Sequence, residues 1–170
     1  MEKNIKGTEL MLDQETLHEL FEYRDGELYW KIKANTTIKI GDRAGCKDPK
    51  LGATTRIKRR LYKNNRIIFM MFNGWLPDRL DYIDCNRLND KIENLRPATL
   101  SETCCNRRKP KSNVSGYKGV SWNTSRNKWI ASISKDTKQF NLGYFDNKEE
   151  AYKVYCNAAN KYHGEFANVG

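Results

Sequence analysis

The segment RLDYIDCNRLNDKIENLRPATLSETCCNRR, residues 79–108, holds the side chains best suited to chemistry on a phosphodiester. A turn rich in asparagine and aspartate lies between two short apolar runs, and a basic segment with a helical pattern follows. Hydrolysis of a phosphodiester needs a base that activates water and a cation that neutralises charge on the leaving oxygen. The segment has carboxylates and amides but no histidine. The question is therefore whether the chain cuts nucleic acid or only binds it.

The charge distribution favours a polyanionic partner. The net charge is +10, and residues 31–112 hold twenty bases against eight acids, whereas residues 1–30 hold eight acids and three bases. Each phosphate that a base neutralises releases condensed counterions, so DNA or RNA fits such a surface. Basic charge alone does not choose between DNA and RNA, and a solvated basic surface is the alternative.

The composition argues against membrane and zinc-binding classes. No run approaches the ~20 apolar residues that span a bilayer, and the N-terminus lacks the apolar core of a signal peptide. We therefore expect a cytoplasmic protein with no membrane partner. The five cysteines lack the CxxC pairs of a zinc site, and His18 and His163 lie at opposite ends of the chain. Reduced thiols and no structural zinc are expected.

The pattern of the first half predicts mixed helices and strands. Residues 11–23 predict a short helix capped by Asp13. Strands are predicted for GELYWKIK and TTRIKRRLYK, on either side of the glycine-punctuated loop GDRAGCKDPKLG. The apolar stretch RIIFMMFNGW predicts a core helix that ends at Gly74. One face of the first helix should carry Leu17, Leu20 and Phe21.

The second half has a different pattern. Residues 106–116 are polar, basic and interrupted by Pro110, which is a linker composition. Beyond them, YKGVSW, KWIASIS and QFNLGYF predict three strands, and a helix should run from Asp146 to Gly164. Its apolar stripe comprises Ala151, Val154, Tyr155, Ala158 and Tyr162. Strand alternation directs Trp129, Ala131, Ile133, Phe140 and Leu142 toward this helix, and leaves Lys128, Ser132, Ser134, Gln139 and Asn141 outward.

Residues 65–107 resemble the HNH homing-endonuclease family common in phages. The resemblance rests on NRIIFMMFNGWLP followed by LDYIDCNRLNDKIENLRPATLSETCCNRR. The family pattern is Asp-His-Ile-Asn-Gly-Asn/Asp-Arg-x-Asp-Asn-x-x-Glu-Asn-Leu-Arg, and a helix with a further Asn follows. The resemblance implies an α+β fold in which two short strands and a helix, the ββα-metal motif, surround one divalent metal.

Carried over by position, the family's roles fall on residues that are only partly retained. Asp81 matches the metal-binding Asp, and Asn94 matches the Asn of Glu-Asn-Leu-Arg, where we expect it to brace the loop. Tyr82 stands at the general-base His, Thr103 at the helix Asn that binds metal, and Asn65 at an earlier His. Tyrosine has an ordinary pKa near ~10 and is a poor base, and threonine offers no carbonyl oxygen. We therefore expect an inactive or strongly impaired nuclease that requires no cofactor, with magnesium or manganese bound only if the site still works.

Residues 116–168 resemble the plant APETALA/ethylene-response-factor DNA-binding domain. The resemblance rests on GYKGVSW, KWIASI, LGYFDNKEEAYKVYCNAAN and YHGEFAN. In that family the three-stranded sheet lies in the major groove, and the helix packs behind it. The contacts that it implies, together with the outward Lys128, are Lys118, Gly119, Ser121, Asn123, Arg126, Ser132, Ser134, Gln139, Asn141 and, to a phosphate, Tyr155. Gln and Asn read adenine edges, whereas the guanine-reading arginines of the plant proteins are missing, so a different target is expected.

A third candidate surface is the basic run at residues 56–66. As a single strand it would place Arg56, Lys58 and Arg60 on one face, where they would track phosphates, although a solvated edge is the alternative. Lys109 and Lys111 are candidates to lie along the backbone between the domains.

Together these patterns predict a phage-encoded protein that binds double-stranded DNA in the cytoplasm of the infected bacterial host. The predicted domains are an HNH-like domain at 1–108, a basic linker at 109–116 and an ethylene-response-factor-like reader at 117–170. Two alternatives remain open. One is an active metal-dependent HNH nicking endonuclease. The other is a factor that binds a host or defence protein, such as an anti-restriction or anti-CRISPR protein.

Overall fold

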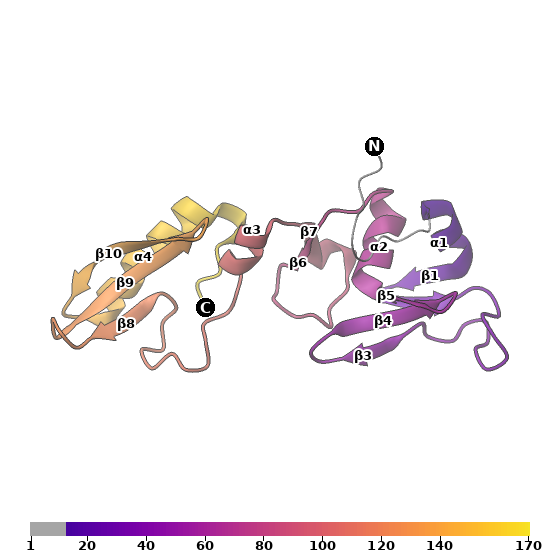
Figure 1. The fold of residues 1–170 in the computed structure, drawn as a ribbon, viewed down its shortest axis with the longest axis horizontal. Coiled ribbons are helices and arrows are strands. Elements are labelled where there is room, and N and C mark those ends of the chain that lie inside the picture. The colour runs from indigo at the N-terminus through magenta and orange to yellow at the C-terminus, as the bar shows by residue number, and fades with distance from the viewer. Residues whose placement is uncertain (1–12) are drawn as a thin grey trace. The chain divides into compact units, whose positions relative to one another are not determined.

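The chain builds its sheets from hairpins, and a helix packs against one face of each larger sheet (Figure 1). The computed structural model describes residues 13–170, and the chain divides into two compact units, Met1–Pro97 and Ala98–Gly170. The predicted α+β class is confirmed.

The first unit opens with a short helix and a two-stranded hairpin. These elements are α1 (Gln14–Leu20), β1 (Phe21–Arg24) and β2 (Glu27–Trp30). The carboxylate of Asp13 caps α1 by accepting a hydrogen bond from the Thr16 amide at 2.7 Å, as predicted. The prediction that this helix runs to residue 23 is wrong, and residues 11 and 12 lie outside the described residues. Phe21 leaves the helix because it pairs across the hairpin with Trp30, with ring centroids 4.6 Å apart.

A second sheet has the order β3 (Cys46–Asp48), β4 (Gly52–Ile57), β5 (Arg60–Lys63). The predicted loop over residues 41–52 thus contains a strand. The single strand predicted over TTRIKRRLYK is also wrong, because Lys58 and Arg59 turn the chain back with φ of 45° and 70°. Arg56 pairs with Leu61, and Arg60 lies one position along, opposite Ile57. Consequently Arg56, Lys58 and Arg60 do not share one strand face.

Helix α2 (Asn64–Asn73) packs against the second sheet. It forms where a core helix was predicted, and Gly74 ends it in the left-handed conformation with φ of 72°. Ile67 and Ile68 are fully buried, and burial of such a side chain contributes about 1.5–3 kcal/mol. The core of this unit combines these side chains with Leu17, Phe21, Leu28, Trp30, Ala44, Ile57, Tyr62, Phe69, Met71 and Leu95.

The first unit ends with the elements that carry the nuclease-like motif. They are β6 (Leu80–Tyr82), a single 3-10 turn η1 (Ile92–Asn94) and β7 (Leu95–Pro97). Strands β6 and β7 pair antiparallel, with Asp81 opposite Arg96 and Tyr82 opposite Leu95. Two short strands therefore precede a helix, the order that the HNH resemblance implies.

The second unit is a three-stranded antiparallel sheet packed on one long helix. Its elements are α3 (Leu100–Cys105), β8 (Val120–Asn123), β9 (Lys128–Lys135), β10 (Lys138–Phe145), α4 (Lys148–His163) and η2 (Gly164–Phe166). Helix α4 begins at Lys148, two residues after the predicted start at Asp146. Asn147 caps it, because the Asn147 side chain accepts a hydrogen bond from the Glu149 amide. The sheet has the order β10-β9-β8, and its inner face meets α4.

The inner face of this sheet follows the predicted alternation. Ala131 and Ile133 are buried, and Leu142 packs against the core beside a bulge at Gly143. Phe140 lies at the edge of this core. It is 45% exposed, and its ring stacks on Tyr162 of α4.

The segment predicted as a linker is tied into the second unit. Ser115 is 5% exposed, and its hydroxyl donates to the Val120 carbonyl at 2.7 Å. Helix α3 also contacts β9 and η2. Along the chain, the boundary between the compact units falls between Pro97 and Ala98, whereas the sequence predicted a linker at residues 109–116. Ser115 is tied in by a local hydrogen bond that spans five residues, and the long-range contacts are made by α3, which precedes the predicted linker.

Gly119 sits where the start of the sheet meets the long helix. Its φ is +73°, and a Cβ at this position would overlap the ring of Tyr155, which is 3% exposed. Its carbonyl accepts a hydrogen bond from the Ser132 amide at 2.8 Å. Both the backbone conformation and the close approach of the ring therefore require glycine.

We predict that Gly119→Ala lowers the free energy of unfolding of the second unit by about 2–5 kcal/mol, because left-handed strain adds to overpacking. Gly116→Ala is the matched control, since Gly116 has φ of +83° and nothing lies within 4 Å of an added Cβ. It should cost only the backbone strain, about 1–2 kcal/mol. Urea unfolding, monitored by hydrogen exchange, measures the loss of unfolding free energy in each variant. Equal losses in the two variants would contradict the packing argument.

Candidate active site and nucleic-acid interface

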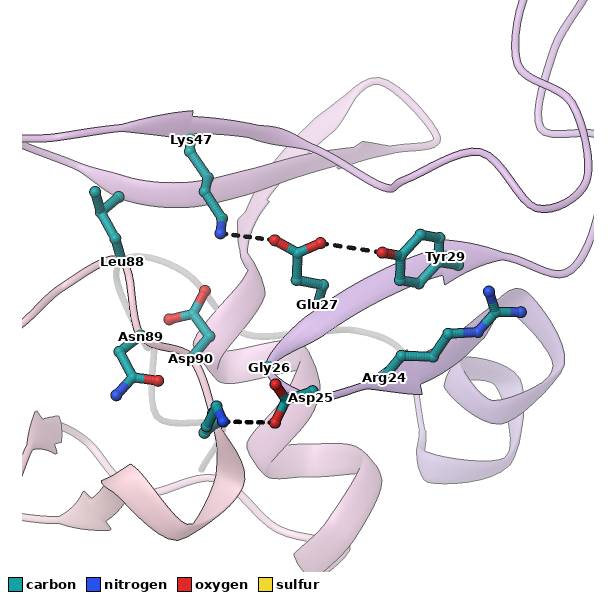
Figure 2. Close-up of a pocket in the computed structure, with 10 residues that line it drawn as sticks. Arg24, Asp25, Gly26, Glu27, Tyr29, Lys47, Leu88, Asn89 and Asp90 are labelled. Atoms are coloured by element: carbon teal, nitrogen blue, oxygen red, sulfur yellow. Dashed lines mark hydrogen bonds and ion pairs between the residues drawn. The ribbon is translucent and has the colours of Figure 1, made fainter.

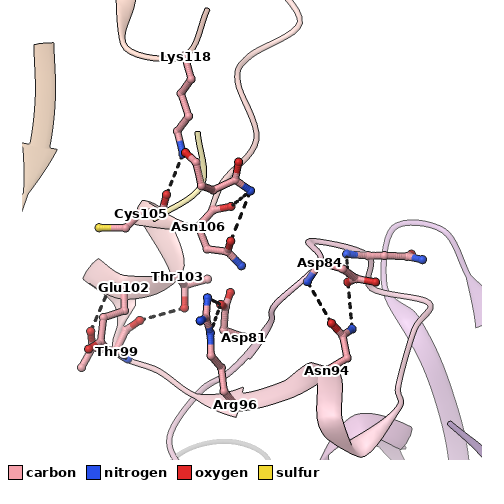
Figure 3. A network of polar contacts seen from close by, with 12 residues as sticks. Asp81, Asp84, Asn94, Arg96, Thr99, Glu102, Thr103, Cys105, Asn106 and Lys118 are labelled. Carbon is pink, nitrogen blue, oxygen red and sulfur yellow. Dashed lines mark hydrogen bonds and ion pairs between the residues drawn. The ribbon is translucent and has the colours of Figure 1, made fainter. Parts of the chain in front are cut away.

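The loop between β6 and β7 is closed by Asn94 (Figure 3). The Asn94 side-chain amide donates to the Asp84 carboxylate at 3.0 Å and to the Asn89 carbonyl at 2.8 Å. Its side-chain oxygen accepts a hydrogen bond from the Asp84 amide at 3.0 Å. Asn94 is buried, so these bonds satisfy a polar side chain that has little access to water. The residue thus holds the two ends of the motif loop together.

Asp81 is engaged by an arginine on the neighbouring strand. The guanidinium of Arg96 donates through Nε and Nη2 to one carboxylate oxygen of Asp81, at 3.0 and 2.9 Å. Asp81 is only 5% exposed, so this ion pair compensates a charge that would be costly to bury alone. A cation at this carboxylate would have to compete with the arginine.

Tyr82 donates its hydroxyl proton to a buried carboxylate. Its Oη lies 2.9 Å from Oδ1 of Asp90, which is 2% exposed. Burial, reinforced by the nearby negative charge of Asp90, raises the pKa of Tyr82 well above its ordinary value. Burial likewise raises the pKa of Asp90 to about 6. A tyrosine in this environment stays protonated at neutral pH and cannot accept a proton from water.

Asn65 reaches the same hydroxyl from helix α2. Its side chain hydrogen-bonds Tyr82, and Asn65 is 6% exposed. Among the described residues its Oδ1 has no hydrogen-bond partner. The structure therefore joins two positions at which the family has histidine, Asn65 and Tyr82, into one buried polar group with Asp90.

Asp90 is the residue of this group that motif matching missed. The family pattern has Asp-Asn where this chain has Asn89 followed by Asp90, and this reversal was the available signal. Asp90 also lines an open polar pocket of about 450 Å³ (Figure 2). Other acids of that pocket are already paired, Glu27 with Lys47 at 2.7 Å and Asp25 with Lys91 at 2.6 Å. The pocket therefore offers no excess of either charge.

Thr103 lies on α3 in the second unit. Its hydroxyl donates to the Thr99 carbonyl at 2.9 Å, within a helix that begins with a capping box between Thr99 and Glu102 (Figure 3). Across the described part of the chain, no three His, Cys, Asp or Glu residues gather closely enough to hold a metal ion. With Asp81 paired to Arg96 and the Thr103 hydroxyl donating to its own helix, these side chains do not fit the divalent metal of the HNH family.

The outer face of the second unit's sheet is polar. Register places Ser132 opposite Asn141 and Ser134 opposite Gln139. Ser134, Gln139 and Asn141 are exposed, whereas Ser132 is partly buried. Asn141 also accepts a hydrogen bond from the Gly143 amide at the bulge, which fixes its side chain. These residues form the exposed surface that the strand alternation predicted.

An arginine and an aromatic ring extend this face. The Arg126 guanidinium lies over the ring of Tyr144, 4.4 Å from its centroid. Tyr144 pairs with Ile130, and Ile130 pairs with the exposed Ser121, so these side chains share the outer face. Asn123 caps the turn by accepting from the Arg126 amide. The sequence comparison missed Ile130 and Tyr144, although strand alternation places Ile130 beside the predicted contacts.

Three predicted DNA contacts have other partners within the fold. The Lys118 ammonium donates to the carbonyl oxygens of Cys105 and Asn168, both at 2.8 Å. Lys128 pairs with the exposed Asp146 at 3.1 Å. Tyr155 is buried against Gly119, on the helix face that packs on the sheet, and its predicted phosphate contact stays a prediction.

The two families indicated by the motifs are found in the chain. The family model for HNH endonuclease matches residues 62–103, and the model for the AP2 domain matches residues 115–165. No solved structure matches the chain. Within the described residues, no helix has the length and apolar character that crossing a membrane requires.

Curated relatives come from viruses. Protein 3.8 of Escherichia phage T7 is 39% identical over 97 residues, which cover 56% of this chain and 79% of that protein. An uncharacterized HNH endonuclease of Acanthamoeba polyphaga mimivirus is 33% identical over 106 residues, which cover 61% of this chain and 54% of that protein. The chain therefore belongs to the family of phage protein 3.8 and combines an HNH endonuclease module with an AP2 domain.

Proposed function

We propose that this protein binds duplex DNA through its AP2 domain, in the cytoplasm of an infected bacterial host, and that its HNH module no longer hydrolyses DNA. The proposal keeps the predicted division of labour between an HNH-like domain and a reader. The AP2 domain recognises the DNA sequence, and the basic first unit adds sequence-independent binding to phosphates.

The outer sheet face supports the DNA-binding part. A polar, exposed sheet face with a helix behind it matches the geometry in which the AP2 family uses its sheet. Gln139 and Asn141 carry side-chain amides, which pair with adenine edges in the major groove. Arg126, whose guanidinium lies over the Tyr144 ring, is placed to contact either a phosphate or a base. We therefore expect a target richer in A·T pairs than that of the plant proteins.

The Tyr82–Asp90 hydrogen bond carries the second part of the proposal. Water attack on a phosphodiester needs a base near neutral pH, and the family's base position holds a protonated tyrosine whose hydroxyl is already donated to Asp90. The ion pair between Arg96 and Asp81 is weaker support for the loss of hydrolysis. Arg96 belongs to the Glu-Asn-Leu-Arg core that the family pattern itself contains. Without a base, neither magnesium nor manganese restores hydrolysis.

Two alternatives give different results in one experiment. Bound sites are selected from random duplex DNA, with magnesium and with chelator, and the recovered DNA is analysed for strand breaks. Site enrichment without breaks supports the proposal, whereas metal-dependent breaks support a nicking endonuclease. No contact among the described residues favours the protein-binding alternative, an anti-restriction or anti-CRISPR role, so it is not proposed.

We predict that negative charge on the outer sheet face weakens duplex binding. Ser121→Glu combined with Gln139→Glu should reduce affinity at least about tenfold, because carboxylates would face phosphates. Asn157→Glu combined with Asn160→Glu, on exposed positions of α4, introduces the same charge behind the sheet. This control should change affinity less than about threefold. Fluorescence anisotropy at fixed salt measures both, and equal losses would show that the sheet face is not the interface.

The unmodified protein is predicted to show no magnesium- or manganese-dependent nicking of supercoiled plasmid above background. Tyr82→His alone should achieve little. Tyr82→His combined with Thr103→Asn, and with Asn65→His where needed, should give a non-additive gain because the groups act as one unit. Robust nicking by the unmodified protein that Asp81→Ala abolishes would establish an active endonuclease and end this proposal.

Asp90 is predicted to make stability depend on pH. Its folded pKa of about 6 lies above the ordinary 3.8, so the native state binds more protons than the unfolded state between these values. The free energy of unfolding should therefore fall as pH rises through this window. Asp90→Asn keeps an acceptor for Tyr82 and removes the titration. The variant should lose this slope and gain about 1–3 kcal/mol at pH 7. Urea unfolding across pH tests this, and identical slopes in both proteins would refute it.

A further inference from the structure

The β4–β5 hairpin of the first unit concentrates positive charge in a short stretch of the chain. Residues 49–77 contain seven bases and no acid. Five of these bases lie within residues 56–63 and are exposed: Arg56, Lys58, Arg59, Arg60 and Lys63. The neighbouring Asp48 uses its carboxylate to accept hydrogen bonds from the Lys50 and Leu51 amides in the turn that precedes β4.

The hairpin buries one face against the core and carries exposed bases on its other face and at its tip. On the face toward α2, Thr55, Ile57 and Tyr62 are 1%, 4% and 8% exposed. On the other face, Arg56 lies opposite Leu61 and Lys63 lies opposite Thr54. Leu61 is 54% exposed, so that face is open to solvent. Core packing therefore fixes the orientation of the strands and directs Arg56 and Lys63 outward, whereas Arg60 lies opposite Ile57 and is exposed next to the tip.

The turn at the tip is built from residues that disfavour its conformation. Lys58 and Arg59 both have positive φ, as a two-residue I′ turn requires, and such turns strongly prefer Asn-Gly or Asp-Gly. The chain uses Asp-Gly at residues 25–26 in the hairpin between β1 and β2. Lys58 and Arg59 at the tip of the β4–β5 hairpin therefore lower the stability of the turn. Their charges also repel those of Arg56 and Arg60. A polyanion that lies against the tip removes that repulsion.

We infer that the tip and the solvent-facing side of the β4–β5 hairpin form a second DNA-contacting surface that binds phosphates without reading sequence. The inference rests on the proposed function, because duplex DNA is the polyanion that the AP2 domain would bring to this protein. A two-stranded β-ribbon also fits the major groove of B-DNA, so the tip can reach phosphates on both sides of the groove.

The test exchanges the strained turn for the preferred one. Lys58→Asn combined with Arg59→Gly removes two charges and installs the Asn-Gly pair that favours the I′ turn, so the fold should be at least as stable as before. The matched control is Lys33→Gln combined with Lys39→Gln, which removes two exposed charges from the loop after β2 in the same unit. Thermal unfolding of each variant verifies that the unit remains folded.

The readout is the salt dependence of binding to a duplex of random sequence. The hairpin variant should bind about tenfold or more weakly at low salt, and the slope of log affinity against log salt should become less steep by about 1.8, or 0.9 for each lost phosphate contact. The control should keep the wild-type slope. An unchanged slope in the hairpin variant, or an equal change in the control, would overturn the hairpin inference alone. Failure of the wild-type protein to bind duplex DNA would overturn the proposed function and this inference with it.

Discussion

Each three-stranded sheet in this protein is held by a helix that packs against one of its faces, and the rest of the structure depends on this constraint. An isolated two-stranded hairpin is at best marginally stable in water, and a small sheet gains stability by packing an apolar face against a helix. Helix α2 packs against β4 and β5, and α4 packs against β8–β10. Because side chains alternate along a strand, the opposite face is left to solvent. That face carries polar residues in the second unit and bases in the first.

The nuclease-like motif is preserved as a structural element around buried polar pairs. Asn94 closes the loop, Arg96 compensates Asp81, and Asp90 accepts from Tyr82. Each of these contacts satisfies a group that would be costly to bury alone. This chain retains the loop but replaces the general base of the family. It therefore keeps the contacts that stabilise the fold without the group that would activate water. This separation explains how the motif pattern stays recognisable while the groups that would do the chemistry differ.

The sequence predicted helix caps, helix ends and apolar helix faces well, because each depends on the types of a few neighbouring residues. Asp13 caps α1, Gly74 ends α2, and Ala151, Tyr155 and Ala158 of the predicted α4 stripe are buried, because caps and periodicity act within a few residues. Val154 and Tyr162 of that stripe are not buried. The two families were also readable from the sequence, since their motifs are long and specific. The turn at Lys58–Arg59 was not readable, because neither residue is a turn former. Its conformation is imposed by strand pairing and by the burial of Ile57 and Tyr62.

The sequence by itself determined the α+β class, the two families, the polar face of the second sheet and the substitutions at Tyr82 and Thr103. Only the tertiary structure decided what those side chains contact. It brought Asp90 to Tyr82 from eight residues away, and it tied Lys118 to the Cys105 and Asn168 carbonyls. It also buried Tyr155 behind Gly119. The reason is that a motif fixes residue types at spacings along the chain, whereas burial and hydrogen bonding depend on segments that meet only after folding.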